Sequence, residues 1–151
     1  MNKAKNNHTG VVQPYLFFNG KCEEALEFYR QAVGAEVEMM MRFKDSPEPC
    51  TPPGGLPAGY ETRIMHANLR VGSTSFMASD GCSAEPPNFQ GFSLSLTVAS
   101  EGEADRAFGA LAAGGKVEMP LTRTFWSPRF GMVEDRYGVS WMVMVQPADQ
   151  K

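Results

Sequence analysis

The stretch FYRQAVGAEVEM at residues 28–39 returns at residues 108–119 as FGALAAGGKVEM, 80 positions later and without a gap. Phe28, Gly34 and the Val-Glu-Met run at 37–39 are identical in the two copies. Each copy follows one apolar run and leads through a glycine into another, which is typical of a strand–helix–strand unit. An internal repeat of this kind predicts two related modules in one chain.

Each copy has the pattern of an amphipathic helix between two strands. Apolar residues recur at helical spacing over 22–33 and 101–113. Ser100 is a suitable N-cap for the second helix, and Gly34 and Gly114 stand where a left-handed residue commonly ends a helix. Strands are expected on either side of the helices, at 13–18, 35–43, 92–98 and 115–119.

The two copies differ in length because of one insertion. Their later hairpin glycines, Gly72 and Gly138, are only 66 positions apart, so the first copy is 14 residues longer. The extra residues are found at 46–59 (SPEPCTPPGGLPAG), where five prolines and three glycines predict a loop. We therefore expect an α+β fold of two tandem βαβββ modules. Its expected divisions are a flexible tail at 1–10 and a single domain at 11–146, with module one at 11–80, a linker at 81–90 and module two at 91–146.

Composition excludes several classes of protein. The 151 residues are 42% hydrophobic with a net charge of −3, which predicts a globular domain with its own core. No apolar run is long enough to cross a membrane, and no secretory signal is recognisable, so we expect a cytoplasmic protein. The weak charge favours neither nucleic acid nor an anionic membrane as a partner. Three cysteines without CxxC spacing argue against a disulfide framework.

Several longer motifs carry a family resemblance. They are PYLFFNGKCEEALEFY at 14–29, HANLRVG at 66–72, FMASD at 76–80 and FWSPRFGMVEDRYGVSW at 125–141. Together they resemble the PhnB-like branch of the glyoxalase/bleomycin resistance/dioxygenase (vicinal oxygen chelate) superfamily. Proteins of this branch are often labelled demethylubiquinone methyltransferases, although they lack a methyltransferase fold. The sequence departs from the branch pattern at Ser127, Arg136 and Val139.

The resemblance implies a curved mixed sheet around a cavity, helices on its outer face, and a homodimer. It also implies four inner-face positions that hold a divalent metal in the active members. Those positions here are Gln13 (or Pro14), Phe76 (or Met77), Ser93 and Met142. None of these side chains is a usual ligand for Mn, Fe, Zn or Ni. We therefore predict no metal and no other cofactor.

Strand alternation selects the side chains that would line such a cavity. The predicted ligand-binding residues are Tyr15, Phe17, His66, Asn68, Phe76, Ser93, Ser95, Trp126, Arg129 and Met142. His66 is the candidate general base, because imidazole exchanges protons near neutral pH. The alternative is a structural histidine bonded to Asn68 or to a backbone carbonyl. Asp80 and Asp135 end strands, and we expect them to cap turns rather than to catalyse.

Three functions remain open on these residues. The first is a metal-independent protein that binds a small molecule between apolar walls with a few polar anchors. The second is a metal-dependent lyase or dioxygenase of the same superfamily. The third is a module whose open cavity faces another chain.

Overall fold

The computed structural model describes residues 9–48, 52 and 54–147. Module one contains β1 (Tyr15–Phe17), α1 (Cys22–Val33), β2 (Glu36–Arg42), β3 (Ile64–Val71) and β4 (Thr74–Ser79). Module two contains β5 (Leu94–Val98), α2 (Glu101–Ala112), β6 (Lys116–Thr122), β7 (Phe130–Glu134) and β8 (Ser140–Val145). Short 3-10 turns at Phe43–Asp45 and Tyr60–Thr62 flank the insertion, whose described residues form no helix or strand. Most of the expected tail at 1–10 lies outside the described residues.

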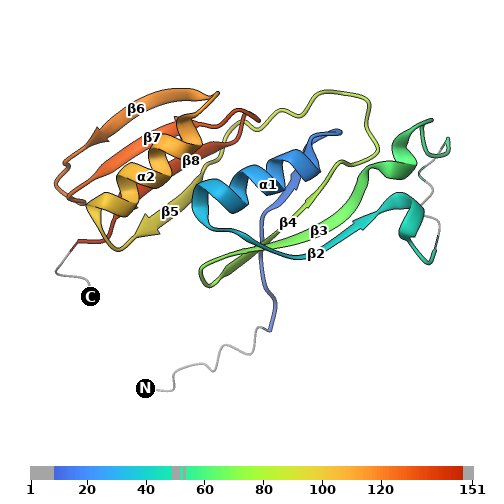
Figure 1. Cartoon of the computed structure of the whole chain (residues 1–151), viewed down its shortest axis with the longest axis horizontal. Helices are drawn as coiled ribbons and strands as arrows, with labels where there is room; N and C mark the ends of the chain where they lie inside the picture. Colours follow the sequence, from blue (N-terminus) through green and yellow to red (C-terminus); the bar gives the residue numbers. More distant parts are fainter. Residues whose placement is uncertain (1–8, 49–51, 53, 148–151) are drawn as a thin grey trace, which may run out of the picture.

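The two modules have the same strand topology. The strand orders are β1-β4-β3-β2 and β5-β8-β7-β6, with β1–β4 and β5–β8 parallel and the other pairs antiparallel. The predicted duplication of a βαβββ unit is therefore confirmed (Figure 1). Each module forms its own four-stranded mixed sheet.

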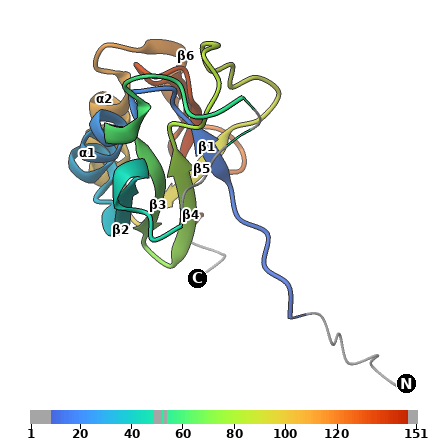
Figure 2. The same ribbon diagram turned by 90° about the vertical axis from the view of Figure 1, so that its right-hand side faces the viewer.

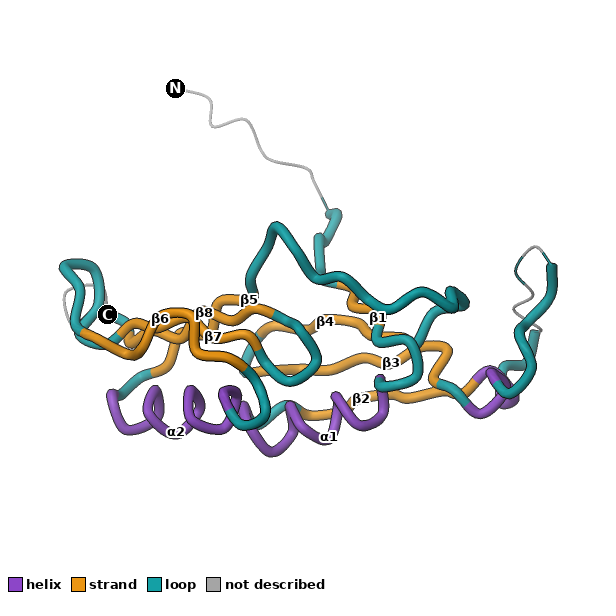
Figure 3. The backbone as a smooth tube through the Cα atoms, turned by 90° about the horizontal axis from the view of Figure 1, so that it is seen from above, coloured by secondary structure: helices purple, strands orange, loops and turns teal. Residues whose placement is uncertain are grey.

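The molecule has two layers. Both helices lie on one side of the sheets, and the described N-terminal residues 9–14 leave on the other side (Figure 3). A view turned by 90° likewise shows this segment directed away from the helices (Figure 2). We call the helix-free side of the two sheets the open face. Each sheet thus buries one surface under its own helix and leaves the other for a different contact.

Local signals in the sequence explain where the helices begin and end. Gly34 ends α1 with a φ of 68°, and Gly114 follows α2 with a φ of 77°, both in the left-handed region that glycine adopts without strain. The Ser100 hydroxyl accepts a hydrogen bond from the Glu103 amide at 3.2 Å, which confirms the predicted N-cap.

The modules share one core. Buried residues of both sheets and both helices form a continuous cluster. Within it, the Tyr29 hydroxyl on α1 donates to Asp135 Oδ2 at 2.6 Å, and the Trp141 indole donates to the same oxygen at 2.9 Å. The other carboxylate oxygen accepts from the amides of Tyr137 (2.8 Å) and Val139 (3.2 Å). Asp135 therefore caps its turn, as predicted, and also joins module two to module one.

Candidate functional site

A row of hydrogen-bonded side chains crosses the open face of module one. Tyr15 Oη lies 2.9 Å from His66 Nδ1, and His66 Nε2 lies 2.9 Å from Asn68 Oδ1. The amide oxygen of Asn68 only accepts, so it selects the tautomer with a proton on Nε2, and Nδ1 then accepts the Tyr15 phenol proton. Tyr15 is 38% exposed and His66 is half-buried. The row therefore presents a hydroxyl and an imidazole at fixed positions on an accessible surface.

Apolar side chains surround this row. Phe17 stacks on Tyr15 with ring centroids 4.9 Å apart and an angle of 23° between the rings. Cross-strand register places Met77 beside both Tyr15 and Asn68, and Met39 beside Asn68 from the other side. Because partners in register share a face, these thioethers flank the polar row. The result is an apolar and aromatic surface with a few polar atoms among its side chains.

The open face of module two is richer still in methionine. Trp141, Val143 and Val145 are buried, so the intervening residues of β8 point to the open face. With their cross-strand partners, the apolar residues of this face are Met119, Phe130, Met132, Met142 and Met144. Trp126 packs edge-on against Phe130 at 5.3 Å between ring centroids, and so borders the same surface.

Two predicted site residues lie elsewhere than expected. Phe76 is only 5% exposed and belongs to the core under the helices. It therefore does not lie on the open face, where Met77, the alternative given for this position, lies instead. Arg129 pairs with Asp105 on α2, with Nη2 and Oδ1 2.6 Å apart, and is thus held toward the helix layer. Alternation alone could not separate Phe76 from Met77, because both are apolar.

The remaining predicted residues divide between the two sheets. Tyr15, Phe17, His66 and Asn68 are on module one, whereas Ser95, Trp126 and Met142 are on module two. Ser93 immediately precedes β5. The predicted site residues of a single chain therefore lie on two neighbouring sheets.

A cavity of about 860 Å³ lies in the seam between the modules. Its walls come from the β3–β4 hairpin, from the whole of β5 and from the start of α2. Most of its lining side chains are apolar, including Val33, Val71, Phe76, Leu94, Leu96, Val98 and Trp141. Ser93 and Ser95 also line it. We call it the seam cavity.

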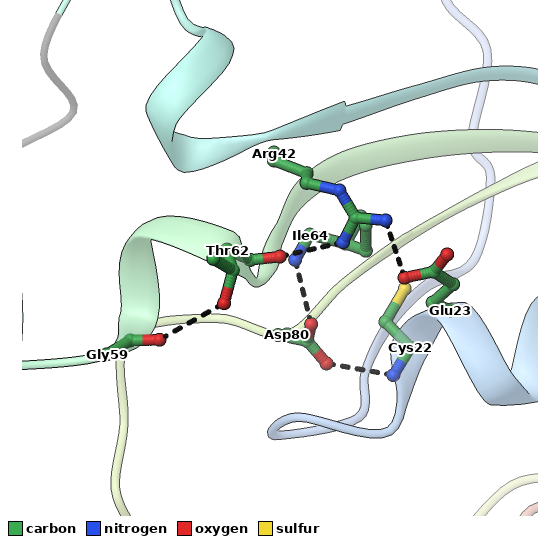
Figure 4. Close-up of polar contacts among 7 residues, drawn as sticks. All are labelled: Cys22, Glu23, Arg42, Gly59, Thr62, Ile64 and Asp80. Carbon is green, nitrogen blue, oxygen red and sulfur yellow. Dashed lines mark hydrogen bonds and ion pairs between the residues drawn. The ribbon is translucent and has the colours of Figure 1, made fainter.

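Asp80 is structural, as predicted. Its Oδ1 accepts from the amides of Gly20 (2.7 Å) and Cys22 (2.9 Å), and Oδ2 accepts from the Ile64 amide (2.9 Å). Figure 4 shows the carboxylate between the start of α1 and the start of β3. Because α1 has no side-chain cap of its own, Asp80 supplies the acceptor that the helix start needs.

The donors on the open face do not suit the divalent metal that the superfamily implies. Met77 and Met142 offer thioethers and Ser93 a hydroxyl, where hard or borderline ions require imidazole or carboxylate. Across 9–48, 52 and 54–147, no three His, Cys, Asp or Glu residues gather closely enough to hold a metal ion. His66 has both ring nitrogens in hydrogen bonds and lacks such neighbours.

No helix in the described part of the chain is long and apolar enough to span a membrane.

Known proteins share the sequence motifs and the fold described above. The family model described as 3-demethylubiquinone-9 3-methyltransferase matches residues 11–144. Protein YjdN of Escherichia coli (strain K12) is 38% identical over 89% of this chain and 94% of its own length. The crystal structure of protein PA1353 from Pseudomonas aeruginosa is 47% identical, with a TM-score of 0.75 over 90% of this chain and 98% of that one.

Two further structures share the fold. A PhnB protein from Bacillus cereus is 30% identical with a TM-score of 0.73, covering 90% of this chain and 99% of its own. A glyoxylase/bleomycin resistance protein/dioxygenase domain from Frankia sp. EAN1pec shares the fold at 16% identity and a TM-score of 0.63, over 93% of this chain and 94% of that one. Motifs, duplicated topology and relatives agree, and the chain belongs to the PhnB-like family described as 3-demethylubiquinone-9 3-methyltransferase.

Proposed function

We propose that the protein binds a small planar aromatic compound on the open face, without a metal ion. The observation that carries the proposal is the Tyr15–His66–Asn68 row on an accessible surface. Three side chains from two strands are held at hydrogen-bonding distance where neither helix covers them. Holding three side chains in one arrangement costs side-chain entropy. Because these side chains are already ordered, less entropy is lost when a ligand binds to them.

The chemistry of the surface indicates the class of ligand. The stacked rings of Tyr15 and Phe17 offer an aromatic surface against which a planar ring can pack. Methionine side chains adapt their shape and make favourable contacts with aromatic rings. The phenol of Tyr15 and the imidazole of His66 can form hydrogen bonds with one polar substituent. A ring that carries a hydroxyl or carbonyl oxygen satisfies all three features.

The metal-dependent alternative gains no support from the residues. A lyase or dioxygenase of this superfamily would bind its substrate through the ion, and the donors at the four positions that the resemblance implies are thioether, hydroxyl and amide groups. The proposal rests on the residues of the open face and not on the reaction in the family's description. His66 as a general base remains a prediction, because binding alone requires only its hydrogen bonds.

Calorimetric titration with 4-nitrophenol tests the proposal, because this probe has one ring and one acidic hydroxyl. We expect saturable binding by the wild-type chain. His66→Ala should weaken it about tenfold, which corresponds to the loss of one hydrogen bond, and Phe17→Ala should weaken it similarly. Phe125→Ala is the matched control, since Phe125 is an almost fully exposed aromatic residue outside the row.

Two results would overturn the proposal. One is the absence of saturable binding by the wild-type chain. The other is equal affinity in wild type, His66→Ala and Phe17→Ala, which would place the bound probe elsewhere. Dialysis against EDTA beforehand should leave the affinity unchanged.

A further inference from the structure

We infer that the side-chain amide of Asn68 is the donor that selects the ligand, and that it selects an aromatic ring carrying an ionised oxygen. This selection rests on the proposed function and deepens it, because it names the charge state in which the ligand binds. A phenolate or a ring carboxylate has the required chemistry. His66 then acts largely as a positioning residue, whose hydrogen bond holds the Asn68 amide in place.

The hydrogen bonds of the row all run in one direction. The Tyr15 phenol donates to His66 Nδ1, and His66 Nε2 donates to Asn68 Oδ1, each at 2.9 Å. The direction follows from the amide oxygen, which can only accept. Hydrogen bonds in such a chain polarise one another, so the group at the end of the chain becomes a stronger donor. That group is the side-chain N–H2 of Asn68.

The side-chain nitrogen of Asn68 is available to a ligand. No hydrogen bond to this nitrogen is formed by any residue that the structure describes, because the one contact of the Asn68 side chain is made by Oδ1. Asn68 is half-buried, and within the described ranges every buried side-chain nitrogen or oxygen has a partner. An unbonded Nδ2 must therefore reach the surface. It presents two N–H donors on the open face.

The neighbouring donors on this part of the open face are already engaged. Arg70 is the next residue of β3 that points to the same side. Its guanidinium binds Glu36 and also Glu38, with Nε and Oε1 3.1 Å apart in the second pair. The phenol and imidazole protons are used within the row itself. A ligand can use any of these donors only by breaking an existing bond, whereas the N–H groups of Asn68 require no such exchange.

The surroundings of Asn68 favour a charged acceptor over a neutral one. A hydrogen bond to an ionised oxygen is about twice as strong as one between neutral groups. Met77 and Met39 lie beside Asn68 in register, and their apolar side chains keep water from the amide, which strengthens the bond further. Because the site lies on an accessible surface, the bound oxygen keeps part of its hydration and avoids the full cost of burying a charge.

One substitution isolates the donor. Asn68→Asp preserves the size of the side chain and the oxygen that accepts from His66, but it replaces the N–H2 group by a second, charged oxygen. Asn88→Asp is the matched control, because Asn88 is an exposed asparagine in the linker between the modules. Both variants add one negative charge, and only the first changes the row.

The ionisation of 4-nitrophenol, followed by absorbance against pH, tests the inference because phenol and phenolate absorb differently. Saturating wild-type chain should move the midpoint of this ionisation about one pH unit lower, which corresponds to phenolate bound about tenfold more tightly than phenol. Asn88→Asp should give the same displacement. Asn68→Asp should abolish it and weaken binding at pH 8 about 100-fold, because a donor is lost and a like charge is introduced.

Nitrogen-15 NMR of the chain without ligand tests the direction of the row. At pH 8, where an ordinary imidazole is neutral, the His66 proton should be on Nε2. A proton on Nδ1 would overturn the inference, because Asn68 would then donate to Nε2 and turn its oxygen outward.

The failure of this inference can be told from the failure of the proposed function. An ionisation midpoint that wild type leaves unmoved, or that Asn68→Asp displaces as wild type does, would overturn the role of Asn68. If the probe still binds and Phe17→Ala still weakens it, the proposed function stands. A wild-type chain that binds no probe would overturn both.

Discussion

Two buried carboxylates, Asp80 and Asp135, each hold several elements together through hydrogen bonds. Asp80 receives amides from the start of α1 and from β3, and Asp135 receives a phenol, an indole and two amides. Both are buried, and both have all their oxygens in hydrogen bonds. A buried carboxylate is stable only with such partners, because desolvation of an unpaired charge is costly. These two carboxylates are therefore structural, whereas the hydrogen-bonded row at Tyr15 lies on the accessible open face.

Cys22 should be inert in the folded protein. It is fully buried at the start of α1, and burial, with the nearby Asp80 and Glu23 charges, raises the pKa of its thiol far above the ordinary value of 9.0. The reactive thiolate is then scarce at pH 8. Iodoacetamide followed by mass spectrometry should modify the half-exposed Cys82 and leave Cys22 intact until the chain is unfolded in guanidinium. Equal rates at Cys22 and Cys82 in the native protein would contradict the packing described for α1.

At the scale of the elements, the two helices begin by different means. α2 has the Ser100 cap, whose removal in Ser100→Ala should lower the free energy of unfolding by about 1 kcal/mol. α1 depends on the distant Asp80, and Asp80→Ala leaves three amides without their acceptor, so it should cost about 2–4 kcal/mol. Urea unfolding of both variants measures the difference. An Asp80→Ala loss no larger than that of Ser100→Ala would show that Asp80 is not the cap of α1.

Elements with local signals could be predicted from the sequence. The helix at 22–33 was placed correctly because its apolar spacing and Gly34 lie within the segment itself. The side on which a strand residue points could be predicted only where polar and apolar residues alternate, as at His66 and Asn68. In β4 the adjacent Phe76 and Met77 are both apolar, and only the packing against the helices decides that Phe76 is the buried one.

At the scale of the whole molecule, the Tyr29–Asp135 contact between the modules predicts that the stability of the fold decreases at alkaline pH. Burial and the Asp135 charge raise the pKa of Tyr29 above its ordinary value of 10.0. The folded chain keeps the phenol proton where the unfolded chain loses it, so this stability is complete below pH 10 and falls as the pH rises further. Cys22 acts in the same direction from pH 9 upward.

Tyr29→Phe should make the alkaline fall in stability shallower above pH 10. At neutral pH the same variant should lose about 1–3 kcal/mol, because Asp135 loses the phenol that it binds. Guanidinium unfolding between pH 7 and pH 11 measures both effects, and Cys22→Ala separates the contribution of the thiol. An unchanged pH profile in Tyr29→Phe would show that the phenol does not titrate with unfolding.

Long-range contacts between side chains could not be predicted from the sequence, for a physical reason. Tyr29 meets Asp135 across 106 residues, and Arg129 turns toward Asp105 rather than toward the predicted site. Nothing local to these residues encodes the partner, since each pairing depends on how the two modules pack. The Tyr15–His66 contact is similar, because it spans 51 residues and two strands of the sheet that are not neighbours. The repeat predicted the two modules, and packing alone decided which side chains meet.

The central claim is that the open face binds an aromatic ligand through Tyr15, Phe17 and His66 without a metal ion. Titration of the isotope-labelled chain with 4-nitrophenol, followed by NMR of the aromatic side chains after EDTA treatment, tests it most directly. The account predicts that the signals of these three residues shift together and saturate at one affinity. Unchanged signals at all three, or shifts that return only when a divalent ion is added, would contradict it.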